Sequence, residues 1–107
     1  MDSSANVLCD MHFTTIGGDI SLSRYVAAFI RELDRRNITY NLHALGTNIE
    51  ATLEEIADVA EWLIAYLRQE GEIRIFIDVR LTVRFDREQN IQEKILAVTH
   101  KLGATHG

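Results

Sequence analysis

The strongest constraint on the fold is an alternating run in the C-terminal half of the chain. From Ile73 to Phe85 every odd-numbered residue is apolar, and all but one of the even-numbered residues are charged or Thr. Successive side chains of an extended chain point to opposite faces, so a period of two is typical of a β-strand. The run therefore predicts a strand at 73–85 with one apolar face.

Other strand and helix patterns fill the rest of the chain. A second alternating run covers 6–15, and Thr52-Leu-Glu-Glu55 has the pattern of a helix-starting capping box. The predicted elements are strands at 6–15, 39–45, 47–51 and 73–85, and helices at about 21–36, 52–70 and from 90 onward. The order βαββαβ plus a C-terminal helix predicts an α+β, ferredoxin-like fold. Its antiparallel sheet would carry the helices on one face, with the strands in the order fourth, first, third, second.

Composition and charge limit the setting in which the protein acts. The 107 residues suit one domain, which we place at 1–107. A net charge of −5 argues against a nucleic-acid partner, and no apolar run is long enough to span a membrane. The N-terminus lacks the pattern of a secretory signal, and Cys9 is the only cysteine. We therefore expect a cytoplasmic protein without disulfides.

The alternation also predicts the core. Residues on the apolar face of each strand should pack against the apolar stripes of the helices. The residues expected to be buried are Phe13, Phe29, Leu33, Leu42, Ile56, Leu63, Ile75, Ile77 and Val79.

The length of the last strand predicts self-association. Thirteen extended residues span roughly 43 Å, whereas a helix over 53–70 covers only about 27 Å. Leu81, Val83 or Phe85 would then be exposed unless a second copy of the chain covers them, so we expect a homodimer or homotetramer. The alternative is a bend near Thr82, with the C-terminal helix folding back over the overhang.

The opposite face of the predicted sheet is unusually rich in polar groups that can bind ligands. The candidates are Asp10 and His12 from the first strand, His43 from the second, Asn48 and Glu50 from the third, and Phe76 and Asp78 from the fourth. Such a face is either a small-molecule site or a polar surface that is solvated or paired with another sheet. Arg74, Arg80 and Arg84 share the face, and it would be structural if they paired with all of its carboxylates.

Catalytic and metal chemistry find less support in the sequence. His12, His43, Asp10 and Glu50 are metal-ligating types, but their spacing matches no known ligand motif. Cys9 faces the helices by its phase, and no nucleophile motif is present. The Gly-rich loop at 17–19 leads into a helix, as in acylphosphatases, but it lacks their motif and Asp19 would repel an anion. We expect no cofactor.

Three stretches resemble the small thiamine-binding protein family. They are Ile16-Gly17-Gly18 with Ser21-Leu-Ser-Arg-Tyr25-Val26, then His43-Ala-Leu-Gly46-Thr47-Asn-Ile49-Glu50, then Arg84-Phe-Asp86 with Asn90-Ile-Gln-Glu-Lys94. The similarity extends from about Cys9 to Leu102, and its most specific part is the Gly46-Thr47-x-Ile49-Glu50 run.

The resemblance implies a ferredoxin-like domain that forms dimers and tetramers through its sheets. It also implies a non-enzymatic protein that binds thiamine, or its hydroxymethylpyrimidine part, near a subunit interface, for transport, salvage or sensing of the vitamin. An acidic site suits the thiazolium cation, and an aromatic side chain such as Phe76 could stack on its rings. With Thr47 added from the shared motif, the predicted contacts centre on Glu50, which the predicted strand order places beside Asp10 or His12. The alternative is an oligomerising regulatory or structural module without a small ligand, and an acylphosphatase-like enzyme ranks below both.

Overall fold

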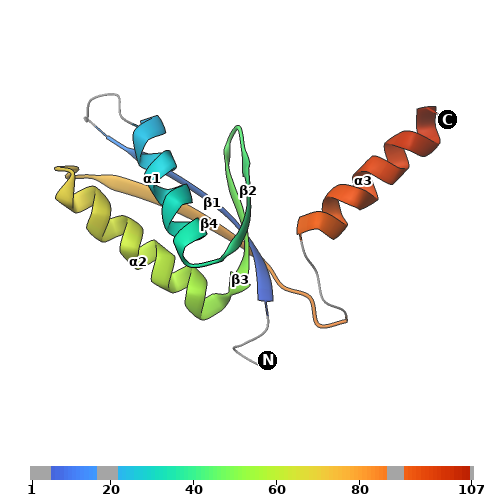
Figure 1. Cartoon of the computed structure of the whole chain (residues 1–107), viewed down its shortest axis with the longest axis horizontal. Coiled ribbons are helices and arrows are strands. Elements are labelled where there is room, and N and C mark those ends of the chain that lie inside the picture. Colours follow the sequence, from blue (N-terminus) through green and yellow to red (C-terminus); the bar gives the residue numbers. More distant parts are fainter. Residues whose placement is uncertain (1–5, 17–21, 87–90, 107) are drawn as a thin grey trace.

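The computed structural model describes residues 6–16, 22–86 and 91–106 (Figure 1). The elements are β1 (Asn6–Thr15), α1 (Leu22–Arg35), β2 (Thr39–His43), β3 (Gly46–Thr52), α2 (Leu53–Gln69), β4 (Ile75–Thr82) and α3 (Ile91–His106). The strands form one antiparallel sheet in the order β2-β3-β1-β4. Both the α+β, ferredoxin-like arrangement and the predicted strand order are therefore confirmed.

Helices α1 and α2 lie on one face of the sheet, and the core fills the space between the two layers (Figure 1). The odd-numbered side chains of β1 point into this core, as the alternation predicts. The fully buried side chains include Val7, Cys9, Met11, Phe29, Leu33, Ile49, Val59, Leu63 and Leu67.

Most of the predicted core is confirmed, but two residues are not part of it. Leu42 is 54% exposed and Val79 is 45% exposed. Leu42 lies on β2 and Val79 lies on β4, and these are the two edge strands. The two helices cover the central strands β1 and β3 more completely than the edges, so the correct strand phase does not ensure burial there. Ile75 and Ile77, also on β4, are partly buried against the core.

The two core-facing helices end in the same way. Asn37 after α1 and Gly71 after α2 both have positive φ, 57° and 93°. In each case the amide of this residue and the amide of the next residue donate to carbonyls of the last turn, as in a Schellman motif. Ile38 and Glu72 donate to Leu33 and Leu67 respectively. At its start, α2 has the predicted capping box between Thr52 and Glu55.

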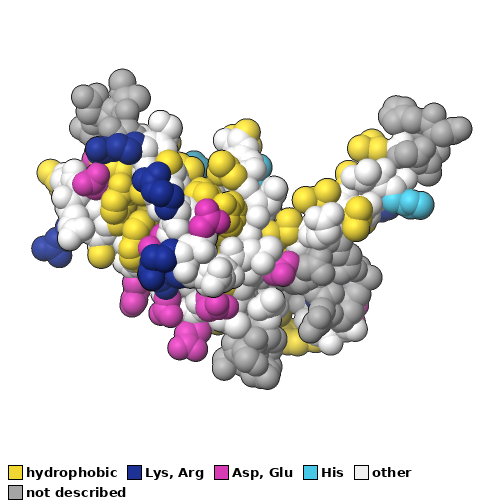
Figure 2. Space-filling model, in the orientation of Figure 1, with side chains coloured by type: hydrophobic (Ala, Val, Ile, Leu, Met, Phe, Trp, Pro, Cys, Tyr) yellow, Lys and Arg dark blue, Asp and Glu magenta, His cyan; other side chains and the backbone are white. Residues whose placement is uncertain are grey.

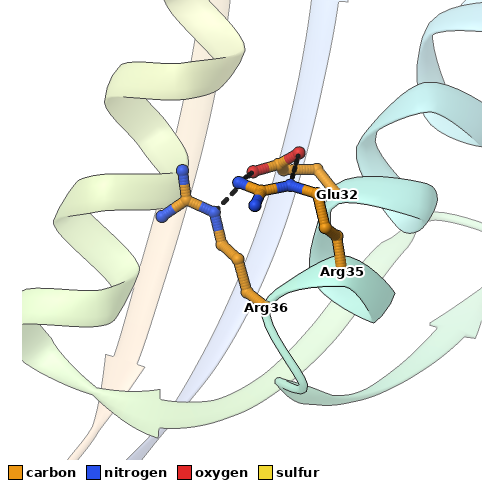
Figure 3. Close-up of polar contacts among 3 residues, drawn as sticks. All are labelled: Glu32, Arg35 and Arg36. Atoms are coloured by element: carbon orange, nitrogen blue, oxygen red, sulfur yellow. Dashed lines mark hydrogen bonds and ion pairs between the residues drawn. The ribbon is translucent and has the colours of Figure 1, made fainter.

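A buried carboxylate anchors the end of α1 (Figure 3). Glu32 is only 7% exposed, and it accepts hydrogen bonds from Arg35 Nε at 3.0 Å and Arg36 Nε at 2.6 Å. The bond from Arg35 lowers the pKa of Glu32 to about 2, with further help from Arg36 and despite the opposing effect of burial. Glu32, Arg35 and Arg36 form what we call the Glu32 triad, in which the two arginines compensate the charge of the ionised Glu32.

The last strand is shorter than predicted. β4 ends at Thr82 rather than Phe85 and begins at Ile75 rather than Ile73. Its pairing with β1 runs only from Leu8, opposite Thr82, to Thr15, opposite Ile75, although β1 itself begins at Asn6. Beyond Ile75 and Thr82 no described strand pairs with the chain, so the apolar alternation continues there without strand-to-strand hydrogen bonds.

Helix α3 does not cover the residues that follow β4. It starts near β3 and then extends away from the other helices (Figure 1). Val83 and Phe85 remain 41% and 83% exposed. Ile95, Leu96, Val98 and Leu102 of α3 are also exposed, and Figure 2 shows hydrophobic side chains along this helix. The alternative of a C-terminal helix folded back over the overhang is therefore wrong for this structure.

Candidate functional site

The face of the sheet that α1 and α2 leave uncovered carries a polar row across all four strands. Asp10 on β1 lies opposite Arg80 on β4 and Asn48 on β3, and Asn48 in turn lies opposite Asn41 on β2. Residues directly opposite on neighbouring strands have Cβ atoms about 5 Å apart. The row therefore places a carboxylate, a guanidinium and two amides within reach of one small molecule.

Asp10 is the centre of the hydrogen bonding in this row. Its Oδ1 lies 2.8 Å from Nε2 of His43 and accepts a 3.3 Å hydrogen bond from the amide of Asn48. The other nitrogen of the imidazole, Nδ1, accepts a hydrogen bond from the backbone N–H of Leu45 at 3.2 Å. This assigns the His43 proton to Nε2, so His43 donates to Asp10. Among the described residues none forms a hydrogen bond or ion pair with Asp10 Oδ2, so this oxygen can still accept a hydrogen bond from a ligand.

Gly46 allows His43 to reach across to β1. A Cβ at Gly46 would lie 2.8 Å from the backbone oxygen of Met11, and 3.4 Å from both Asp10 Oδ1 and His43 Cε1. Because any side chain would displace this backbone, the hairpin between β2 and β3 needs glycine here. The motif glycine therefore has a structural role in forming the Asp10–His43 pair. The tight turn itself lies one step earlier than predicted, at Ala44 and Leu45.

A cavity of about 200 Å³ lies beside Asp10, between the sheet and the first turns of α3. Its polar lining comes from Asp10, Asn48, Arg80 and Thr82. Its apolar lining includes Leu8 on the sheet and Ile91 and Ile95 on α3. Apolar walls with a few converging polar groups are typical of small-molecule sites. We call it the Asp10 cavity.

Glu50 holds the helix that forms one wall of the Asp10 cavity. Its Oε1 accepts the backbone N–H of Ile91, the first residue of α3, at 3.0 Å. Its neighbour on β1 is Leu8, not Asp10 or His12 as predicted, because the register places Asp10 opposite Asn48. Glu50 does not line the Asp10 cavity but a shallower hollow on the β2 side of α3.

The other predicted site residues lie further from the Asp10 cavity. His12 Nδ1 and Asp78 form an exposed pair at 3.7 Å, on the same face. Phe76 is near the far end of β4, with the guanidinium of Arg74 5.6 Å from its ring centre. Thr47 is buried on the opposite side of the sheet, next to Met11, which points toward the helices. The structure thus brings together Asp10, His43 and Asn48 from the predicted set.

The arginines of the face do not neutralise its carboxylates. In the described part of the chain, Asp10, Glu50 and Asp78 form no ion pair with Arg74, Arg80 or Arg84, and Arg84 pairs with Asp86. Arg80 was recognised in the sequence only as a competitor for carboxylates, but here it lines the Asp10 cavity. Leu8, Ile91 and Ile95 were missed because the packing of α3 against the sheet has no periodic signature.

Two candidate chemistries remain, which are metal binding by His and carboxylate side chains and reaction at the Cys9 thiol. Within residues 6–16, 22–86 and 91–106, no group of three His, Cys, Asp or Glu side chains could hold a metal ion. Burial, together with the charge of Asp10, raises the pKa of Cys9 to about 11.

No helix in the described ranges is long and apolar enough to cross a membrane. The acylphosphatase-like loop at 17–19 lies outside the described residues.

Comparisons with known proteins agree with the sequence resemblance. The chain is 31% identical over 93 residues to the UPF0045 protein sll0230 of Synechocystis, covering 87% of this chain and 77% of the relative. It is 29% identical to the UPF0045 protein ECM15 of Eremothecium gossypii, covering 94% and 96% of the two chains.

Two solved structures share the fold. A hypothetical protein of Methanocaldococcus jannascii matches with a TM-score of 0.77 at 22% identity, over 88% of this chain and 96% of its own. A "putative thiamine biosynthesis/salvage protein" of Thermotoga maritima matches with a TM-score of 0.73 at 20% identity, over 87% and 98%. The family model described as thiamine-binding protein matches residues 9–99. The chain therefore belongs to the thiamine-binding protein family.

Proposed function

We propose that this protein binds thiamine or its hydroxymethylpyrimidine part without transforming it, and that the aminopyrimidine ring occupies the Asp10 cavity. The observation that carries the proposal is that Asp10, whose described hydrogen bonds use only Oδ1, lines a cavity with apolar walls in a chain of this family. Membership of the family and a neighbour named for thiamine biosynthesis or salvage support a thiamine-related role.

The chemistry of the cavity matches an aminopyrimidine. The exocyclic amine can donate to Asp10 Oδ2, and the second amide proton of Asn48 can bond to the adjacent ring nitrogen. Because His43 and Asn48 both donate to Oδ1, the carboxylate keeps its orientation before the ligand arrives. Leu8, Ile91 and Ile95 offer apolar contacts to the ring faces.

The size of the cavity favours one ring over two. Sites for drug-sized molecules usually enclose about 300–1,000 Å³, and the Asp10 cavity has about 200 Å³. A bound thiamine would then leave its thiazolium outside the cavity. A net charge of −5 on the whole chain favours that cation there.

This proposal moves the direct ligand contact from Glu50 to Asp10. Glu50 contributes by fixing the start of α3, which supplies Ile91 and Ile95. The second candidate, an oligomerising module without a ligand, is favoured by the exposed apolar side chains of α3 and of the segment after β4. The two candidates differ in whether Asp10 has a ligand to bind.

Isothermal titration calorimetry with thiamine and with hydroxymethylpyrimidine tests the proposal. We expect saturable binding that Asp10→Asn weakens by roughly 1.5–3 kcal/mol, the range for a hydrogen bond to a charged group. The matched control is Asp58→Asn, on the exposed surface of α2, which should leave binding unchanged. The absence of heat with both compounds would favour the ligand-free module.

A further inference from the structure

Arg80 is a charged residue of the Asp10 cavity to which the binding of a neutral aminopyrimidine gives no role. Its register partner is Asp10, and a cross-strand Asp–Arg pair would be the ordinary outcome at this position. The pair does not form in this structure, where His43 and Asn48 hydrogen-bond Asp10 through Oδ1. Within the described residues Arg80 has no carboxylate partner.

Four other described arginines are held by partners within the protein. Arg35 and Arg36 are held by the buried Glu32, Arg24 pairs with Glu70, and Arg74 lies over the ring of Phe76. Arg80 instead lines a cavity that Asp10 also lines. An uncompensated guanidinium beside a hydrogen-bond acceptor suits a ligand that carries both an anion and a donor.

We propose that the Asp10 cavity prefers a phosphate monoester of the hydroxymethylpyrimidine type, and that Arg80 is the residue that determines this preference. The inference rests on the proposed function and specifies its ligand class. In such an ester the phosphate is attached through the methylene group next to the amine-bearing ring carbon. The amine can then lie at Asp10 while the phosphate accepts the paired N–H donors of the guanidinium, a geometry that arginine favours.

The spacing on the sheet limits which phosphate can be recognised. The Cβ atoms of Asp10 and Arg80 lie about 5 Å apart, so the donor and the anion must belong to neighbouring parts of the ligand. A phosphate at the far end of the thiazolium ring, as in thiamine monophosphate, would lie beyond a cavity of about 200 Å³.

Titration of four ligands distinguishes the phosphate preference from the proposed function. They are hydroxymethylpyrimidine, its phosphate, thiamine and thiamine monophosphate, each titrated calorimetrically into the wild-type protein and into Arg80→Gln. We expect the wild type to bind hydroxymethylpyrimidine phosphate at least about tenfold more tightly than the unphosphorylated compound, as a charge-assisted bidentate contact should provide. Arg80→Gln should remove that preference, so that the variant binds the phosphate and the unphosphorylated compound with about equal affinity.

Arg74→Gln is the matched control. It changes an arginine of the same sheet face, outside the Asp10 cavity, and should keep the phosphate preference. Equal affinities for the ester and the free alcohol in the wild type, or a preference that survives Arg80→Gln, would overturn the role of Arg80 while leaving the proposed function intact. If none of the four compounds binds, both proposals fail.

Discussion

Two carboxylates in this chain show how environment decides the role of a residue. Glu32 is buried, and Arg35 and Arg36 both donate to it. Asp10 is partly exposed, and both of its described hydrogen bonds go to the same oxygen, Oδ1. Glu32 is therefore committed to the fold, whereas Asp10 is oriented by the fold and still has an oxygen for a ligand.

The Glu32 triad predicts acid sensitivity. Because the native pKa of about 2 lies below the ordinary value, the ionised form contributes stability above the unfolded pKa of about 4.3. That contribution is lost as the pH falls from about 4.3 toward 2. Glu32→Gln should lower the free energy of unfolding at pH 7 by roughly 1–3 kcal/mol and flatten its dependence on pH below 5. Urea unfolding at several pH values measures both effects. An unchanged pH profile would contradict the role given to the triad.

Cys9 should be inert to thiol reagents in the folded protein. Burial raises its pKa to about 11, so at pH 8 only about one thiol in a thousand is ionised. Colorimetric thiol labelling at pH 8 should be much slower in the native protein than in guanidinium chloride. Rapid labelling of the native chain would mean that β1 opens readily or that the thiol is not in the core.

At the scale of elements, the sequence predicts best where a local pattern determines the structure. The capping box at Thr52, the termination at Asn37 and Gly71, and the inward phase of β1 depend on nearby residues and are confirmed. The predicted end of β4 at Phe85 was wrong, because β4 stops pairing at Thr82, opposite Leu8, while Asn6 and Val7 of β1 pair only with β3.

The candidate site likewise contains some features that a local sequence pattern predicts and others that depend on residues far apart in the sequence. Strand phase predicted that Asp10, His43 and Asn48 share a face, and the structure brings them into contact. The sequence did not predict that Glu50 would hold α3, because this contact joins residues 41 positions apart. The apolar wall from α3 was missed for the same reason.

Glu50 should control the attachment of α3 to the sheet. Glu50→Ala removes the acceptor for the Ile91 N–H, so amide hydrogen exchange in the first turn of α3 should become faster. By moving Ile91 and Ile95, the same change should also weaken ligand binding in the Asp10 cavity. Glu54→Ala, an exposed change on α2, provides the control. Unaltered exchange at Ile91 in Glu50→Ala would show that α3 is held by other contacts.

At the scale of the whole molecule, the isolated chain leaves two apolar regions without cover. One is the end of β4 with the segment after it, where Leu81, Val83 and Phe85 are exposed. The other is α3, where Leu96 and Val98 are more than half exposed. β4 is also an edge strand, with backbone groups available for pairing. A second copy of the chain presents the same strand edge and the same helix, so symmetric pairing can cover both regions.

We therefore predict that the protein is a homo-oligomer in solution. Light scattering at micromolar concentration should give at least twice the chain mass of 12.2 kDa, about 24 kDa. Val98→Glu places a charge on the exposed face of α3 and should shift the protein toward monomer while the circular dichroism spectrum stays folded. Ile64→Glu makes the same change on the exposed side of α2 and should leave the mass unchanged. A wild-type protein that stays at 12.2 kDa across the micromolar range would contradict the prediction. The exposed apolar residues of β4 and α3 would then have to be tolerated in solvent, because self-association would not be burying them.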